Sequence, residues 1–304
     1  MSLTVRPFDD AIEALVADPA STTALPHPAS RVIAVASGKG GVGKTNLAIN
    51  LGLSLARRGL RVGLLDADLG TANVDVLMGI QPRYNLQHVV TGRRSLAQII
   101  VAGPYGLQII PGASGLPDLV DLPDAQRDAL LRALLVLSGS VDLLLIDTSA
   151  GVGRNVVQFI LAAGEVVVLT TPEPAAIVDA YALMKILAGY QVPVAINLVV
   201  NCVRRDAEGD STGHKLAAVA EQFLGRRVQP IGTLPYDQSV LEAVKSQVPL
   251  VRGWPRSPAA QAIDRIGEQL WRDAPTRQAG SDIGRFFRRM LWSSPVACAA
   301  GASQ

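Results

Sequence analysis

Residues 38 to 45 read Gly38-Lys39-Gly40-Gly41-Val42-Gly43-Lys44-Thr45, directly after an apolar run from Val32 to Ala36. Two glycines with four residues between them, followed by Lys and Thr, form the pattern of a phosphate-binding loop between a strand and a helix. The glycines let consecutive N–H groups point at phosphate oxygens, and the helix adds its positive N-terminal end. The stretch, with Asn46 beside it, predicts a nucleoside triphosphate site. A Gly-rich turn with an incidental lysine is the weaker interpretation, because the flanking strand and helix patterns fit the motif.

Short apolar runs alternate with helical periodicity along the chain. The runs are Val32 to Ala36, Val62 to Leu65, Leu107 to Ile110, Leu143 to Ile146, Val166 to Thr170, Val194 to Val200 and Val228 to Leu234. This alternation predicts an α/β fold with a single doubly wound, mostly parallel sheet flanked by helices. We expect a folded domain over 31–272, an N-terminal arm over 1–30 and a C-terminal arm over 273–304, because both ends are rich in Pro, Ser or Arg.

The composition limits the functional classes. The 304 residues are 49% hydrophobic and carry a formal net charge of +2, so no global charge favours a nucleic-acid partner, and direct DNA binding is not expected. The two cysteines, Cys202 and Cys298, match no metal spacing and indicate no disulfide framework. The acidic N-terminus is not typical of a secretory signal, and no apolar run is long enough to span a bilayer. These features predict a cytoplasmic protein.

Two predicted strands end in carboxylates. Asp66, Asp68 and, further on, Asn73 follow the run from Val62, whereas Asp147 follows the run from Leu143 and precedes Gly151. Ligands of such sheets bind beyond the carboxyl ends of the strands. A carboxylate with an amide can hold a water in line with a γ-phosphate, and an Asp after an apolar strand can hold Mg²⁺. Thr45 and Asp147 are therefore the predicted metal residues, and Gly151 can bring its backbone to the γ-phosphate.

Lys39 is not required by an ordinary phosphate loop. A second lysine here resembles the deviant Walker A family of MinD, ParA and the nitrogenase iron protein. The resemblance implies a dimer in which Lys39 reaches the partner's nucleotide. Without it, Lys39 could be a solvated lysine that only adds positive potential.

The same resemblance assigns further roles. It implies that Asp68 positions the attacking water with help from Asn73, and that Lys39 and Lys44 complete the catalytic set. It also implies that Asn201 contacts adenine and that the loop with Pro235 and Asp237 packs along the base. ATP is therefore the expected nucleotide. Asn201 could otherwise merely cap a strand end.

Several other stretches resemble one subgroup, the flagellar-number regulators called FlhG, FleN or YlxH. They are Asp66 to Gly70 with Ala72 to Gly79, Tyr84 to Val89 with Thr91 and Gly92, Pro111 to Gly115, and Pro172 to Pro174 with Asp179 to Leu183 and Lys185. The subgroup implies an ATP-dependent homodimer that restrains the flagellar master activator (FleQ-like) and acts with the FlhF-type GTPase. The GTPase-stimulating Asp-Gln-Ala-x-x-Leu-Arg segment has only a degenerate counterpart in Asp9 to Leu15, without the Gln and Arg.

Other classes make different demands on the sequence. A division-site or partitioning ATPase of the MinD/ParA type that positions another cargo should lack the flagellar-type stretches. A metal-cluster reductase would need paired cysteines at a dimer axis. A metabolic P-loop enzyme would not explain Lys39.

The segment from Asp282 to Trp292 has one apolar stripe, with arginines on its other side. The stripe consists of Ile283, Phe286, Phe287, Met290 and Leu291. This pattern is typical of an interfacial helix on an anionic membrane, so we expect reversible association with the inner face of the cell membrane. A helix that packs on the protein's own core has the same stripe.

Overall fold

The structure is a computed structural model that describes residues 30–68, 73–112, 123–135, 137–190, 192–273 and 283–292. The predicted N-terminal arm therefore lies outside the described residues except for Ser30, as does much of the C-terminal arm. The elements from β1 to α13 run from Arg31 to Arg272. The three domain boundaries stay a prediction.

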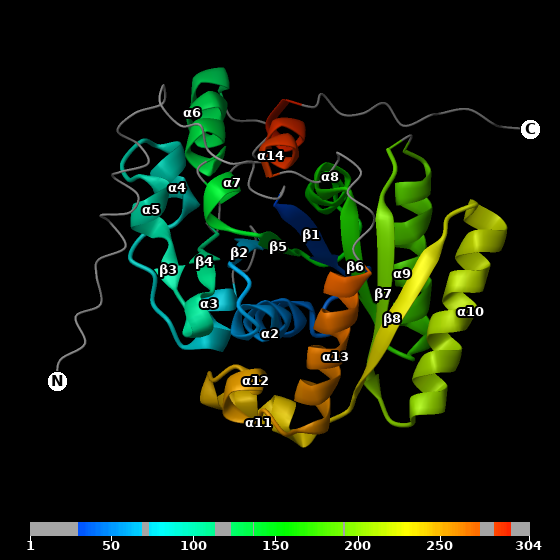
Figure 1. Cartoon of the computed structure of the whole chain (residues 1–304). Coiled ribbons are helices and arrows are strands. Elements are labelled where there is room, and N and C mark those ends of the chain that lie inside the picture. The colour runs from blue at the N-terminus through cyan, green and yellow to red at the C-terminus, as the bar shows by residue number, and fades with distance from the viewer. Residues whose placement is uncertain are drawn as a thin grey trace, which may run out of the picture.

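One eight-stranded sheet forms the centre of the molecule, in the order β3-β4-β2-β5-β1-β6-β7-β8 (Figure 1). The strands are β1 (Arg31–Ala36), β2 (Val62–Ala67), β3 (Val101–Ala102), β4 (Gln108–Ile110), β5 (Leu143–Thr148), β6 (Glu165–Thr170), β7 (Ala195–Val203) and β8 (Val228–Pro235). Every pairing is parallel except that of β3 with β4. The mostly parallel sheet is confirmed, and each of the seven apolar runs overlaps a strand. The two-residue β3 had no comparable apolar signal.

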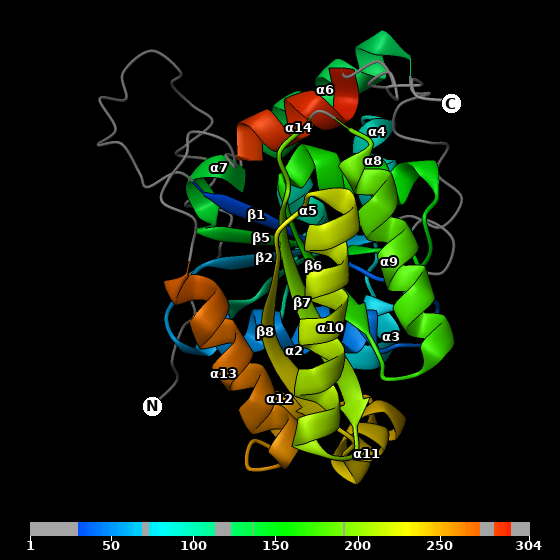
Figure 2. The same ribbon diagram turned by 90° about the vertical axis from the view of Figure 1, so that its right-hand side faces the viewer.

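Helices cover both faces of the sheet. The core on one face includes residues of α2 (Lys44–Arg57), α3 (Val74–Met78), α11 (Gln238–Ser246), α12 (Leu250–Gly253) and α13 (Pro258–Arg272). The other face packs against α4 (Leu86–Val90), α5 (Leu96–Ile99), α6 (Asp124–Leu135), α7 (Leu137–Ser140), α8 (Arg154–Ala163), α9 (Pro174–Ala188) and α10 (Asp206–Leu224). A short 3-10 turn, η1, spans Pro104–Gly106. Figure 2 shows α10 and α13 on opposite sides of β8. Because both faces are covered, every residue of β1, β2, β5 and β6 is buried.

The amino edge of the sheet is fixed by a buried ion pair. Arg31 donates from Nε and Nη2 to the two carboxylate oxygens of Glu165, at 2.8 and 2.5 Å. Arg31 Nη1 donates to the Leu270 carbonyl at 2.6 Å, and Asn197 donates to Glu165 at 2.9 Å. This network joins β1, β6, β7 and α13 at the amino ends of the strands. The predicted site residues lie at the opposite edge, in the loops that follow the carboxyl ends of the strands.

The predicted C-terminal helix forms as α14 (Ile283–Trp292), and in this structure its apolar stripe packs on the protein's own core, so the expected membrane association stays a prediction. Ile283 and Phe286 have no exposed surface, and Phe287 and Met290 are each 3% exposed. The Phe286 ring stacks on Phe159 of α8 with their centroids 6.4 Å apart. Figure 1 shows α14 lying across this face of the domain, beside α6 and α8.

The stripe finds apolar partners within the same chain, because buried side chains of α6 and α8 belong to the same hydrophobic cluster. Arg285 remains exposed on the outer side. The side chain of Leu291, the fifth predicted membrane residue, lies outside the described part. Each helix in the described part of the chain is too short or too polar to span a bilayer.

Candidate nucleotide site

The phosphate loop lies between β1 and α2, as predicted. Gly41 and Gly43 have φ values of 79° and 97°, in the left-handed region that favours glycine, and α2 begins at Lys44. Gly38 lies so close to the Asp179 carbonyl of α9 that a Cβ would overlap that oxygen. The loop is therefore held between the sheet edge and α9.

Asn201, in β7, contacts the backbone of this loop. Its Nδ2 donates to the Val42 carbonyl at 2.7 Å, and a Cβ on Gly43 would lie 2.7 Å from the same nitrogen. The amide thus stabilises the loop backbone here, and its predicted contact with adenine stays a prediction.

Asp237 and Pro235 lie at the end of β8, as predicted, but the Asp237 carboxylate has other partners. It accepts from Ser239 N at 2.9 Å and from Ala259 N at 3.0 Å, which caps α11 and ties it to α13. Partial burial raises the pKa of Asp237, but these hydrogen bonds outweigh burial and hold that pKa below its usual value. The carboxylate therefore fixes the loop in place, and only the surrounding loop is left to contact a base.

Two buried carboxylates stand side by side on adjacent strands. Asp66 of β2 and Asp147 of β5 are register partners and are 2% and 1% exposed. Burial raises the pKa of Asp147 to about 7, although Lys44 and the Thr45 hydroxyl oppose the shift. Neither Asp147 oxygen has a hydrogen bond of good geometry, so this buried acceptor lacks a strong partner beside the phosphate loop.

The loop after β2 begins and ends at predicted catalytic residues. Asp68 and Asn73 lie on its two sides, whereas residues 69–72 are outside the described part. Asp66 accepts from Asp68 N at 3.1 Å and from Val74 N at 3.3 Å. Burial raises the pKa of Asp66 to about 6, although these two hydrogen bonds lower it.

Gly151 joins the loop after β5 to the phosphate loop. It has a φ of 93°, and its N–H donates to the Ser37 carbonyl at 2.9 Å. Ser37 also donates from its hydroxyl to the Lys39 carbonyl at 2.8 Å. A change at Gly151 would therefore reach the phosphate loop through one hydrogen bond.

Lys39 has an acidic partner within its own chain. Its Nζ lies 2.9 Å from Glu173 Oε2, at the start of α9, and the two side chains are 39% and 68% exposed. Such an exposed pair contributes little stability and can exchange partners readily. In the sequence, Glu173 stands out only as part of the subgroup stretch from Pro172 to Pro174. The signal that could have identified Glu173 as a site residue was its charge, next to a proline, just after a predicted strand.

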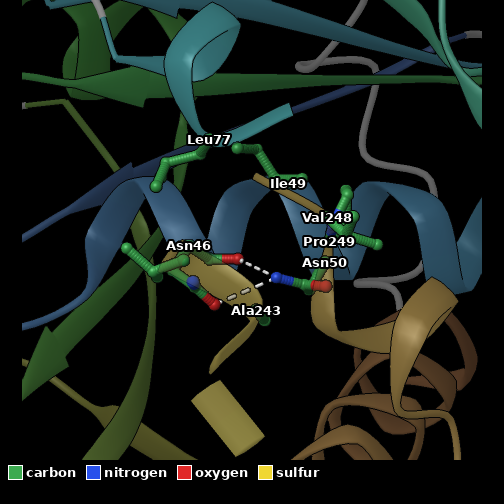
Figure 3. A pocket seen from close by; sticks show the side chains of 8 residues that line it. Asn46, Ile49, Asn50, Leu77, Ala243, Val248 and Pro249 are labelled. Atoms are coloured by element: carbon green, nitrogen blue, oxygen red, sulfur yellow. Dashed lines mark hydrogen bonds between the residues drawn. The ribbon is translucent and has the colours of Figure 1, made fainter. Parts of the chain in front are cut away.

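The predicted residue Asn46 also lines a small pocket under α2 (Figure 3). Asn50 donates to the backbone and side-chain oxygens of Asn46, at 2.8 and 3.0 Å, and accepts from Val251 N at 3.0 Å. The remaining lining residues are apolar side chains and Pro249. The pocket has no cationic group for phosphate, so it is separate from the nucleotide site.

The chain is similar in sequence and in fold to several known proteins. The family model described as ParA, NUBPL iron-transfer P-loop NTPase, matches residues 29–271. Antiactivator FleN of Pseudomonas aeruginosa is 43% identical over 244 residues, which cover 80% of this chain and 87% of FleN. Flagellum site-determining protein YlxH of Helicobacter pylori is 34% identical and covers 86% and 90% of the two chains. Septum site-determining protein MinD of Pyrococcus horikoshii, solved with Mg-ADP, superposes with a TM-score of 0.65 at 24% identity and covers 83% and 98%.

Proposed function

The chain belongs to the ParA/MinD family of P-loop NTPases and is an ATPase, and we propose that it is an ATP-dependent, dimerising regulator of flagellar number. The observation that carries this proposal is the 43% identity to antiactivator FleN over nearly the whole domain. The similarity to YlxH supports the same assignment. YlxH is named as a flagellum site-determining protein, and FleN is named as an antiactivator.

The described residues support Mg-ATP as the ligand. Lys44 would bind the terminal phosphates, and Thr45 and Asp147 would hold Mg²⁺. The weakly partnered oxygens of Asp147 beside the Thr45 hydroxyl fit a hard cation that prefers oxygen ligands. Bound Mg²⁺ would neutralise charge on the phosphates. Asp68, with Asn73, would position the water for hydrolysis.

Dimerisation would give Lys39 its second partner. In the single chain Lys39 contacts Glu173, and the exposure of both groups allows it to leave for the triphosphate of a second copy. A triphosphate carries more negative charge than one carboxylate, so ATP favours the exchange. We therefore expect hydrolysis to be weak and to depend on the dimer.

The flagellar output would pass through protein partners in the cytoplasm. We propose that the ATP-bound dimer restrains a FleQ-like master activator and acts with an FlhF-type GTPase. Association with the membrane would also require α14 to leave its packed position on the core. Burial of four large apolar side chains stabilises the docked helix by roughly 6–12 kcal/mol gross, so the docked state prevails without a compensating ligand.

A chromosomal replacement series tests the flagellar assignment. Strains carrying the parental gene, a deletion or Lys44→Ala are compared by counting flagella per cell in electron micrographs. We expect the deletion and Lys44→Ala strains to carry extra flagella and the parental gene to restore the normal number. Unchanged flagella together with misplaced septa or lost cargo would reject this assignment and favour a division-site or partitioning ATPase.

Iron transfer, which is part of the family description, finds no support among the described residues. Cys202 is the one free cysteine there, and no group of three or more His, Cys, Asp or Glu side chains could hold a metal ion. Cluster chemistry would need paired cysteines.

A further inference from the structure

Asp66 contacts the backbone on both sides of the catalytic loop. Its Oδ1 accepts from Asp68 N at 3.1 Å and its Oδ2 from Val74 N at 3.3 Å. One buried carboxylate therefore holds the residue expected to position water and the residue that follows Asn73. Charged acceptors bond backbone N–H groups more strongly than neutral ones, so Asp66 is suited to fix the span of this loop.

The backbone of Asp66 is in turn held by the loop after β4. Gly112 lies so close to the Asp66 carbonyl that a Cβ would overlap it. The neighbouring Pro111 carbonyl accepts from Leu86 N, the first residue of α4, at 3.1 Å. Two of the subgroup stretches, those that begin at Tyr84 and at Pro111, are thus hydrogen-bonded to each other next to the backbone of Asp66. The closeness of the Asp66 carbonyl is the reason that a glycine is needed at position 112.

We propose that Asp66, held in place by Gly112, is a positioning residue that sets Asp68 and Asn73 for hydrolysis. This inference rests on the proposed ATPase cycle and adds a residue to it. Asp66 acts through Asp68 and does not itself touch the nucleotide. Its loss should therefore lower the rate of the chemical step and leave ATP binding nearly unchanged.

A simple helix cap is the competing explanation. An Asp that only capped α3 would need the contact with Val74 N alone, whereas Asp66 also holds Asp68 N, outside that helix. Asp75 supplies a matched control. It lies in the first turn of α3, and within the described part of the chain its Oδ1 accepts from the neighbouring Val76 N, at 2.7 Å.

The first experiment compares Asp66→Ala and Asp66→Asn with Asp75→Asn in the full-length protein. Single-turnover hydrolysis gives the rate of the chemical step, and fluorescent-ATP titration gives affinity. We expect a fall of about 10- to 100-fold in rate for Asp66→Ala, a smaller fall for Asp66→Asn, which keeps one acceptor, and affinities within about threefold. Asp75→Asn should match the parental protein.

A double-mutant cycle separates positioning from a structural or metal role. If Asp66 acts through Asp68, the double variant Asp66→Ala/Asp68→Ala should hydrolyse ATP no more slowly than Asp68→Ala alone. Multiplied effects, or a Mg²⁺ half-saturation raised more than about tenfold in Asp66→Asn, would overturn the proposal.

Glycine substitutions test the support from the loop after β4. Gly112→Ala should slow hydrolysis as Asp66→Ala does, whereas Gly139→Ala, with open space at its Cβ, should not. Parental rates in the Asp66 and Gly112 variants would reject this inference alone. A parental protein that binds ATP but never hydrolyses it would reject the proposed ATPase cycle instead.

Discussion

Replacement of Phe286 by alanine tests the position of α14. Phe286 has no exposed surface, stacks on Phe159 at 6.4 Å and meets Phe287 edge-on at 4.7 Å. Truncation of a buried Phe to Ala costs about 3–5 kcal/mol, since apolar burial is lost and a cavity remains. At roughly 2–4 °C per kcal/mol for a domain of this size, the melting temperature should fall by about 6–20 °C.

Phe223→Ala is the matched control. Phe223 is 66% exposed on α10, so its truncation should change the free energy of unfolding by less than about 0.5 kcal/mol. Urea and thermal unfolding followed by far-UV circular dichroism measure both variants in parallel without nucleotide. If Phe286→Ala unfolds like Phe223→Ala, α14 is not packed on this core in solution. Its apolar stripe would then be free to bind a membrane.

Three further predictions concern other parts of the molecule. Asp68→Ala should bind ATP and dimerise but hydrolyse ATP very slowly, because water positioning is lost; a parental rate would show the wrong residue was chosen. The raised pKa values of Asp66 (about 6) and Asp147 (about 7) mean that the folded, metal-free protein binds these protons more tightly than the unfolded chain. The associated stability is therefore full below about pH 4 and lost as the pH rises through 6 and 7, and urea midpoints of Asp147→Asn should fall less over that range than parental ones. Arg31→Leu should lower the free energy of unfolding by about 3–5 kcal/mol, because Glu165 is left buried and uncompensated, and ATP affinity should stay parental; calorimetry with nucleotide titration would reveal either failure.

Local patterns were enough to predict the parallel sheet and the phosphate loop. The loop's glycine spacing and the apolar run before it are properties of consecutive residues, and the carboxylates at strand ends follow from parallel topology. The placement of Asp147 beside Lys44 and Thr45 could therefore be expected from the sequence alone.

Contacts between distant segments were not accessible in this way. Lys39 and Glu173 are 134 residues apart, and no sequence period relates the two. The stripe of α14 could be placed on lipid or on protein equally well, because amphipathicity specifies an apolar partner without identifying it. Asp237 was expected beside the base, yet its carboxylate caps α11. The sequence could not separate these two roles, because a short acidic side chain is suited both to contact a ligand and to cap a helix.

Sedimentation velocity with ATP tests the central claim most directly. The parental protein should sediment as a monomer alone and as a dimer with Mg-ATP, whereas Lys39→Ala should bind ATP and stay monomeric. Lys44→Ala should bind no ATP and therefore should not dimerise either. A Lys39→Ala protein that dimerises with ATP as fully as the parental one would contradict the account.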